Sequence, residues 1–107
     1  MQYKTNKLRK LENNRYSILT NDLEHCYLCF GADCYQYNSI DMHEIYGGAN
    51  RKISMENGFC IPLCRQHHAL ITRDNASSLI LKQQCQREYE KTHSREDFMR
   101  LIGKNYL

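Results

Sequence analysis

The segment that decides the fold runs from Asp41 to His68 and reads DMHEIYGGANRKISMENGFCIPLCRQHH. A first strand is expected around Met42–Ile45, and the short apolar run Phe59–Leu63 reads as a second strand. The pair Gly47-Gly48 can supply the positive φ of a tight turn between them. Pro62 marks the edge or the end of the second strand, because proline cannot donate to a sheet ladder. The pattern therefore predicts a strand-turn-strand unit.

Four residues around this unit have the spacing of a zinc site. Cys26-x-x-Cys29 precedes the segment, and Cys64-x-x-His67 closes it at the expected start of a helix. Two thiolates at that spacing can face one metal from a tight turn, and zinc takes four nitrogen or sulfur ligands at tetrahedral angles. The sequence predicts a structural zinc held by Cys26, Cys29, Cys64 and His67. The alternative is a redox pair at Cys26 and Cys29, with Cys64 unrelated to it.

Three further cysteines lie outside this set. Cys60 and Cys85 have apolar neighbours and are expected to be small core residues. Cys34 lies close enough in sequence to compete as a zinc ligand, and this alternative stays open.

Two adjacent histidines are expected to serve different sites. Neighbouring residues on a helix point about 100° apart, so when His67 faces the zinc, His68 faces elsewhere. His68 is therefore a candidate ligand of a second site, opposite His43 on the first strand. The acids Asp41 and Glu44 strengthen this prediction, whereas the alternative for His43 is a partly buried, hydrogen-bonded strand histidine.

Composition limits the remaining choices. A chain of 107 residues is expected to form one domain, residues 1–107, with a modest core that a metal can stabilise. No apolar stretch is long enough for a signal peptide or a membrane span, so a cytoplasmic protein is expected. The net charge of +3 permits nucleic-acid binding and does not require it.

The two ends of the chain are expected to be helical. Residues 1–15 form a basic arm, which is either a solvated helix face or a segment that follows a phosphate backbone. The stretch Tyr16–Thr20 suits a short strand or a helix end equally well. Residues 77–103 are expected to cover the core with helices, one of which starts in a capping box at Ser94 and ends at Gly103. The alternative is that they present an apolar face to a partner protein.

The segments HEIYGGANRKIS, PLCRQHH and FMRLIGKNYL resemble the small HNH-type proteins of phages and prophages of Gram-positive bacteria. These belong to the His-Me finger, or ββα-metal, nucleases. The resemblance implies an α+β fold: a small zinc-stabilised ββα-metal unit, HNH-like or treble-clef-like, with flanking C-terminal helices. It also implies a divalent ion between the two-stranded ribbon and the helix, and a location in the cytoplasm of a bacterial host.

Site roles follow from the resemblance residue by residue. His43 and Glu44 fall on the strand, Asn57 on the loop, where it orients the strand, and His68 on the helix. Where many relatives read Asp-His-Ile or His-His-Ile, this chain reads His-Glu-Ile. A strict alignment makes Glu44 the base and His43 a ligand, whereas an alignment by chemistry makes His43 the base and gives the ion to Asp41 or Glu44. Both assignments stay open.

A second departure lies on the helix. Many relatives carry another histidine one turn after the position of His68, where this chain has Thr72, and this substitution weakens the catalytic ion site.

The expected function is a metal-dependent nuclease that hydrolyses double-stranded DNA with Mg²⁺, Mn²⁺ or Ni²⁺. Arg51 and Lys52, on the turn beside the site, are expected to clamp phosphates, unless they form an ordinary exposed basic turn. The alternative function is a zinc-stabilised module that binds nucleic acid or a protein partner without cutting.

Overall fold

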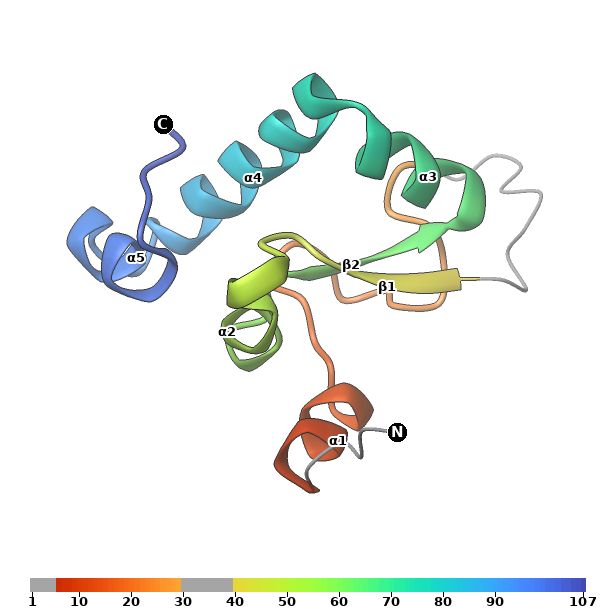
Figure 1. The fold of residues 1–107 in the computed structure, drawn as a ribbon, viewed down its shortest axis with the longest axis horizontal. Helices are drawn as coiled ribbons and strands as arrows, with labels where there is room; N and C mark the ends of the chain where they lie inside the picture. The colour runs from red at the N-terminus through yellow and green to blue at the C-terminus, as the bar shows by residue number, and fades with distance from the viewer. Residues whose placement is uncertain (1–5, 30–39) are drawn as a thin grey trace.

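The computed structural model describes residues 6–29 and 40–107. Cys34, the possible competing ligand, and residues 1–5 of the expected basic arm lie outside these ranges. The described elements, in chain order, are helix α1 (Asn6–Asn13), strand β1 (Ile40–Glu44), the 3₁₀ turn η1 (Gly48–Asn50), helix α2 (Arg51–Glu56), strand β2 (Cys60–Cys64), and helices α3 (Arg65–Arg73), α4 (Asn75–Tyr89) and α5 (Arg95–Ile102). Together they form an α+β structure (Figure 1).

The centre of the molecule is an antiparallel ribbon of β1 and β2. Asp41 lies opposite Leu63 and His43 lies opposite Ile61. Helix α3 follows β2 directly and packs against both strands, so a helix follows the second of two paired strands. The two expected strands and the helix after them are confirmed, whereas η1 and α2 lie between the strands.

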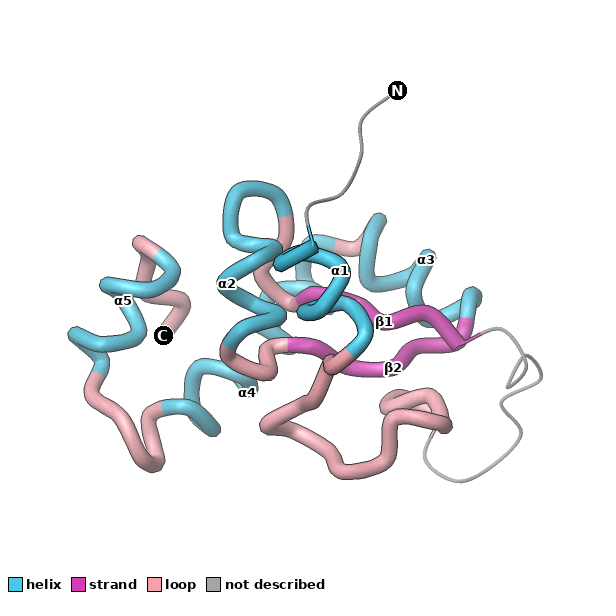
Figure 2. The backbone as a smooth tube through the Cα atoms, turned by 90° about the horizontal axis from the view of Figure 1, so that it is seen from below, coloured by secondary structure: helices cyan, strands magenta, loops and turns pink. Residues whose placement is uncertain are grey.

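The strand β2 is buried along its whole length because other segments cover it. The segment of residues 14–29, which follows α1, runs beside β2 (Figure 2). There the Ile18 amide donates to the Gly58 carbonyl (2.9 Å), and the Tyr27 amide donates to the Pro62 carbonyl (2.8 Å). The Pro62 carbonyl thus points away from β1, so the ladder does not need the missing proline N–H. The prediction that Pro62 marks an edge strand is confirmed.

The link between the strands differs from the predicted tight turn. Gly48 does take a positive φ of 60°, but it opens η1, and α2 then adds a helical turn and a half between the strands. Ser54 on α2 is fully buried, and its hydroxyl donates to the Tyr46 carbonyl (2.7 Å), which ties α2 to the chain leaving β1. Arg51 and Lys52 therefore lie on a helix rather than on a turn.

The C-terminal part of the chain is helical as expected, although α4 begins at Asn75 and not at residue 77. At α4, Asp74 caps the N-terminus by accepting from the Ala76 amide. At α5, Ser94 and Asp97 form a complete capping box, and Gly103 ends the helix with a left-handed φ of 86°. Both features of α5 confirm the sequence prediction.

The core joins the ribbon to this cover through aromatic side chains. The rings of Tyr46, Phe59 and Phe98 lie 5.4 to 6.2 Å apart, with Tyr89 next to Phe59 at 5.5 Å. Cys85 is also fully buried, as is Cys60, which confirms both as core residues. On α4, Leu81, Cys85 and Tyr89 are buried in this core, whereas Leu79 and Ile80 are exposed.

The segment Tyr16–Thr20 is neither a strand nor a helix end. Its residues are irregular, and a single backbone hydrogen bond from Ile18 joins them to the end of α2. Tyr16 packs its ring over Gly58 and donates its hydroxyl to the Glu56 carbonyl (2.9 Å).

We expect Gly58→Ala to destabilise the protein by about 2 kcal/mol. Gly58 has a φ of 72°, which costs an alanine about 1 kcal/mol, and a Cβ there would lie 2.5 Å from the Tyr16 ring. Gly48→Ala is the matched control because Gly48 has a φ of 60° and no atom near its Cβ position. Urea denaturation should show the larger loss at Gly58. Equal losses, or no relief of the Gly58→Ala loss in a Tyr16→Ala background, would contradict the role given to Tyr16.

Candidate metal centre

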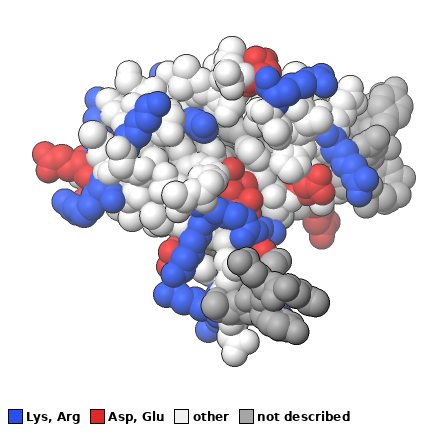
Figure 3. Space-filling model, in the orientation of Figure 1, with Lys and Arg blue, Asp and Glu red and all other residues white. Residues whose placement is uncertain are grey.

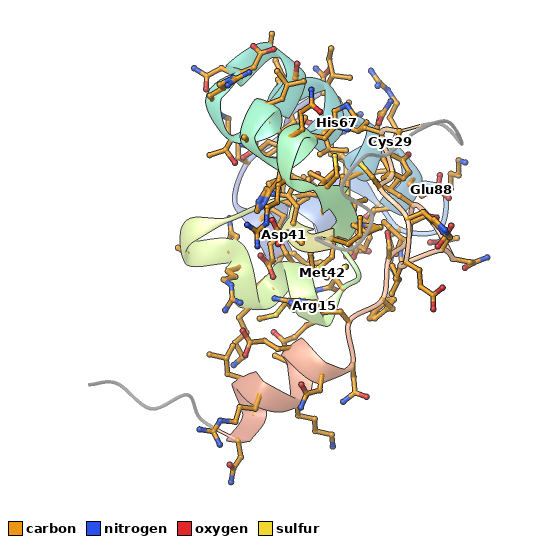
Figure 4. All side chains as sticks on the ribbon, turned by 90° about the vertical axis from the view of Figure 1, so that its right-hand side faces the viewer. Arg15, Cys29, Asp41, Met42, His67 and Glu88 are labelled. Atoms are coloured by element: carbon orange, nitrogen blue, oxygen red, sulfur yellow. The ribbon has the colours of Figure 1, made fainter. Side chains whose placement is uncertain are left out.

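The residues Cys26, Cys29, Cys64 and His67 form one cluster. Their ligand atoms all lie within 4.8 Å of one another, and among the described residues no other group of three or more such side chains does so. His67 Nδ1 lies 3.4 Å from the Sγ atoms of Cys26 and Cys29 and 3.3 Å from that of Cys64. The Sγ atoms of Cys29 and Cys64 lie 3.9 Å apart. Figure 4 shows His67 and Cys29 side by side.

Each ligand of this cluster is placed by a local feature of the backbone. Cys26 and Cys29 stand at the two ends of a tight turn, closed by the Cys29 amide donating to the Cys26 carbonyl (3.3 Å). The hydrogen bond from Tyr27 to Pro62 fastens this turn to the edge of β2. Cys64 is both the last residue of β2 and the N-cap of α3, and its Sγ accepts from the His67 amide (3.4 Å).

The cluster fits a zinc ion. Zinc–sulfur bonds of about 2.3 Å and zinc–nitrogen bonds of about 2.0 Å at tetrahedral angles put the ligand atoms about 3.5 to 3.8 Å apart. The observed distances of 3.3 to 3.9 Å agree with these edges to within a few tenths of an ångström. Three sulfurs and one imidazole, with Cys26 and Cys64 buried, are typical of a closed structural site. These four predicted ligands are thus brought together in a set compatible with zinc.

The second cluster lies on the face of β1 that α3 covers. His68 Nδ1 lies 3.1 Å from Asp41 Oδ2, and the rings of His68 and His43 pack edge to face with centroids 5.3 Å apart. Asp41 and His43 are two residues apart on a strand, so their side chains share one face. His67 and His68 point into different clusters, as the helical geometry predicted.

The Asp41–His68 contact is a direct hydrogen bond or ion pair at 3.1 Å, a separation that two neighbouring ligands of one ion also have. Ligand bonds of about 2.1 Å at right angles put two ligand atoms about 3.0 Å apart, close to the observed 3.1 Å. The Asp41 side chain is about two-fifths exposed and the His68 side chain about one-third exposed, so water can complete the coordination of an ion between them.

Burial, and after it the neighbouring charge of His68, lower the pKa of His43 to about 4, with a smaller contribution from Lys82 and an opposing effect of Glu44. At neutral pH the His43 imidazole is therefore uncharged, which is the form that accepts a proton. An anionic phosphate bound beside it would raise this pKa again.

This low pKa of His43 predicts a loss of stability in mild acid. The unfolded chain binds the proton below pH 6.5 and the folded chain binds it only near pH 4, so stability falls as the pH drops through this window. We expect a loss of at most about 2 kcal/mol, because His43 is partly exposed. Denaturation of the parent and of His43→Gln at pH 7 and pH 5 checks this, since acid release of zinc affects both alike. An equal pH effect in both proteins would contradict the assignment.

Glu44 lies on the opposite face of β1. Its carboxylate contacts the Arg15 guanidinium (2.5 Å) and lies 3.8 Å from Arg51 Nε. Figure 4 shows Asp41 toward α3 and Arg15 on the side of Met42. The structure thus separates Glu44 from His43, although the sequence analysis placed both in one catalytic set. The pattern did not reveal Arg15 as the partner of Glu44, because 29 residues separate them.

Asn57 lies, as expected, in the link between the strands, where it follows α2 as its C-cap. Its side-chain amide donates to the Ile53 carbonyl (2.9 Å), and within the described residues this amide has no hydrogen bond to the first strand. The buried Ser54, which sequence reasoning missed, makes the link to the chain after β1 instead. Thr72, where relatives carry a histidine, donates its hydroxyl to the His68 carbonyl (2.7 Å).

The two predicted phosphate clamps have different surroundings. The Arg51 guanidinium is paired with Glu12 of α1 (2.7 Å) and lies near Glu44, whereas Lys52 is exposed. The pairing of Arg51 with two acids raises its pKa, chiefly through the hydrogen bond to Glu12. Arg51 is thus already neutralised by protein carboxylates.

No helix within the described parts of the chain has the length and apolar character needed to cross a membrane. Comparisons of the chain with protein-family models, curated proteins and solved structures found no match.

Proposed function

We propose that the protein is a metal-dependent nuclease that hydrolyses phosphodiester bonds of DNA, and that its fold is of the ββα-metal type. The observation that carries the proposal is the meeting of Asp41, His43 and His68 on one face of a strand-strand-helix unit. A metal-ligand pair beside an uncharged imidazole is the donor set that phosphodiester hydrolysis needs.

The residues have separate roles in this proposal. Asp41 and His68 would hold a divalent ion, which would supply neutralisation of the charge that grows on the phosphate oxygens. The neutral His43 takes a proton from the attacking water, whose oxygen forms the new bond to phosphorus in line with the P–O bond that breaks; the sugar oxygen of that bond leaves and takes a proton from water. A zinc ion held by Cys26, Cys29, Cys64 and His67 would fix the end of β2 against the start of α3, the helix that carries His68.

A second candidate function is a zinc-stabilised module that binds nucleic acid without cutting it. This candidate is favoured because Asp41 and His68 alone would hold the divalent ion. Glu44 is paired with Arg15, and Thr72 stands where relatives carry a further histidine. The two candidates predict the same zinc and the same fold.

Cleavage of supercoiled plasmid DNA by the zinc-loaded protein separates them. We expect nicking when Mg²⁺, Mn²⁺ or Ni²⁺ is added, and no nicking after a chelator weak enough to leave the zinc in place. A folded, zinc-loaded protein that cuts DNA with none of these ions would leave the binding module as the function.

A further inference from the structure

The last residues of the chain are built into the fold by a buried glutamine. Gln86 on α4 is fully buried, and its amide donates to Asn105 Oδ1 (2.8 Å) and accepts from the Tyr106 amide (2.8 Å). Gln83 adds a hydrogen bond to the Tyr106 carbonyl (2.9 Å). These bonds hold residues 103–107 along α4, in the position seen in Figure 1.

Residues 103–107 place the Tyr106 ring next to two lysines. The Lys104 and Lys82 ammonium groups lie 5.0 and 5.5 Å from the ring centroid, and the ring packs against Tyr46 at 5.4 Å. Cation–π contact restricts both side chains without neutralising their charge. Lys82 and Lys104 are thus held in place as cations.

These two lysines differ from the basic residues that are paired with acids. Within the described residues, ion pairs occupy Arg15, Arg51, Lys91, Arg95 and Arg100 but neither Lys82 nor Lys104. In Figure 3 the basic side chains are spread over several elements, including the region of α4 and the C-terminal tail. The charges at Lys82 and Lys104 are therefore available to a bound anion.

The position of Lys82 links this surface to the second cluster. The Tyr46 hydroxyl donates to the Lys82 carbonyl (2.6 Å), and Tyr46 follows β1 by two residues. Lys82 thus lies on the part of α4 that contacts the chain leaving β1, the strand that carries His43.

We propose that Lys82 and Lys104, held around Tyr106, form the surface that binds the phosphate backbone of the nucleic acid next to the reacting phosphate. This inference rests on the proposed function and identifies where its substrate lies. It also assigns the phosphate contacts to the C-terminal tail and α4, and not to Arg51, which pairs with Glu12 and Glu44.

The test measures, by fluorescence anisotropy, the binding of a labelled DNA duplex to the zinc-loaded protein over a range of salt concentrations, without added divalent ion. Lys82→Gln with Lys104→Gln should lower the slope of log K against log salt by about 1.8 and weaken binding about 50-fold at 0.1 M salt. Lys91→Gln with Arg100→Gln removes the same charge from two acid-paired residues and should change binding less than threefold. Lys82→Arg with Lys104→Arg should keep the parent affinity.

Zinc content and melting temperature confirm that each variant is folded. Lys104→Gln alone, at an exposed position, is a milder variant and should change the slope of log K against log salt by about 0.9. If the parent cuts and binds DNA but the Lys82 and Lys104 variants bind as the parent does, this inference is wrong while the proposed function stands. If Lys52→Gln accounts for the loss instead, the phosphate surface lies on α2. A parent that neither binds nor cuts DNA overturns both proposals.

Discussion

Cys26→Ser is expected to leave the protein largely unfolded at 37 °C, and stripping the zinc from the parent should have the same effect. The four ligands join three segments, namely the turn at Cys26 and Cys29, the end of β2 and the first turn of α3. Structural zinc contributes about 10–16 kcal/mol of apparent binding free energy in zinc-finger peptides, whereas whole domains are stable by about 5–15 kcal/mol. Loss of the metal is therefore expected to remove free energy comparable to the whole stability of a domain.

Cys85→Ser is the matched control for this change. Cys85 is a fully buried thiol outside the cluster, so its replacement tests the Cys-to-Ser change without the metal. Its expected cost is about 1–3 kcal/mol, with the zinc content unchanged. Circular dichroism melts and elemental analysis provide the readouts. A Cys26→Ser protein that melts within a few degrees of the parent, or a parent without zinc, would contradict the structural role of the metal.

The second large effect concerns cleavage. His43→Ala should lower the cleavage rate by about 10²–10⁴-fold, the usual contribution of a general base. His68→Ala should lower it at least as far, because a divalent ion would keep only one protein ligand, Asp41. The two variants should differ in their response to metal, since a higher ion concentration should partly restore His68→Ala but not His43→Ala.

Glu44→Gln separates the two assignments that the sequence left open. Glu44 pairs with Arg15 on the face of β1 opposite His43, so we expect cleavage within about threefold of the parent and a stability loss of about 2 kcal/mol. Plasmid nicking rates and urea denaturation, measured on the same preparations, give both readouts. A folded Glu44→Gln protein without cleavage would make Glu44 a ligand or a base and would overturn the assignment to His43.

Local patterns were enough to predict the central unit. The strand positions, the start of a helix at Cys64–His67 and the divergence of His67 and His68 follow from periodicity and helix geometry, which act over a few residues. The zinc set could be predicted because both halves repeat a two-residue gap, which fixes the distance between ligands within each half. The caps of α5 at Ser94 and Gly103 are likewise local.

The contacts that could not be predicted join residues far apart in the chain. The pairing of Glu44 with Arg15 spans 29 residues, and nothing in the strand pattern specifies which face Glu44 takes until the face of Asp41 is known. The helix α2 was missed because the glycine pair before it favours a turn. The hydrogen bonds of Gln86 with Asn105 and Tyr106 were also not predicted. A glutamine in a polar helix is expected to be exposed, whereas Gln86 is fully buried.

The most direct test of the account is a titration of the zinc-loaded protein with Mn²⁺, followed by the NMR signals of its histidine rings. The proposed ion site predicts strong paramagnetic broadening of His68 and His43 at one Mn²⁺ per chain, with His25 and His93 affected far less. The same titration of an Asp41→Asn protein should show the broadening only at much higher Mn²⁺. Broadening spread equally over all the histidines, or absent at His68 in a folded, zinc-loaded protein, would contradict the proposed ion site and with it the assignment as a nuclease.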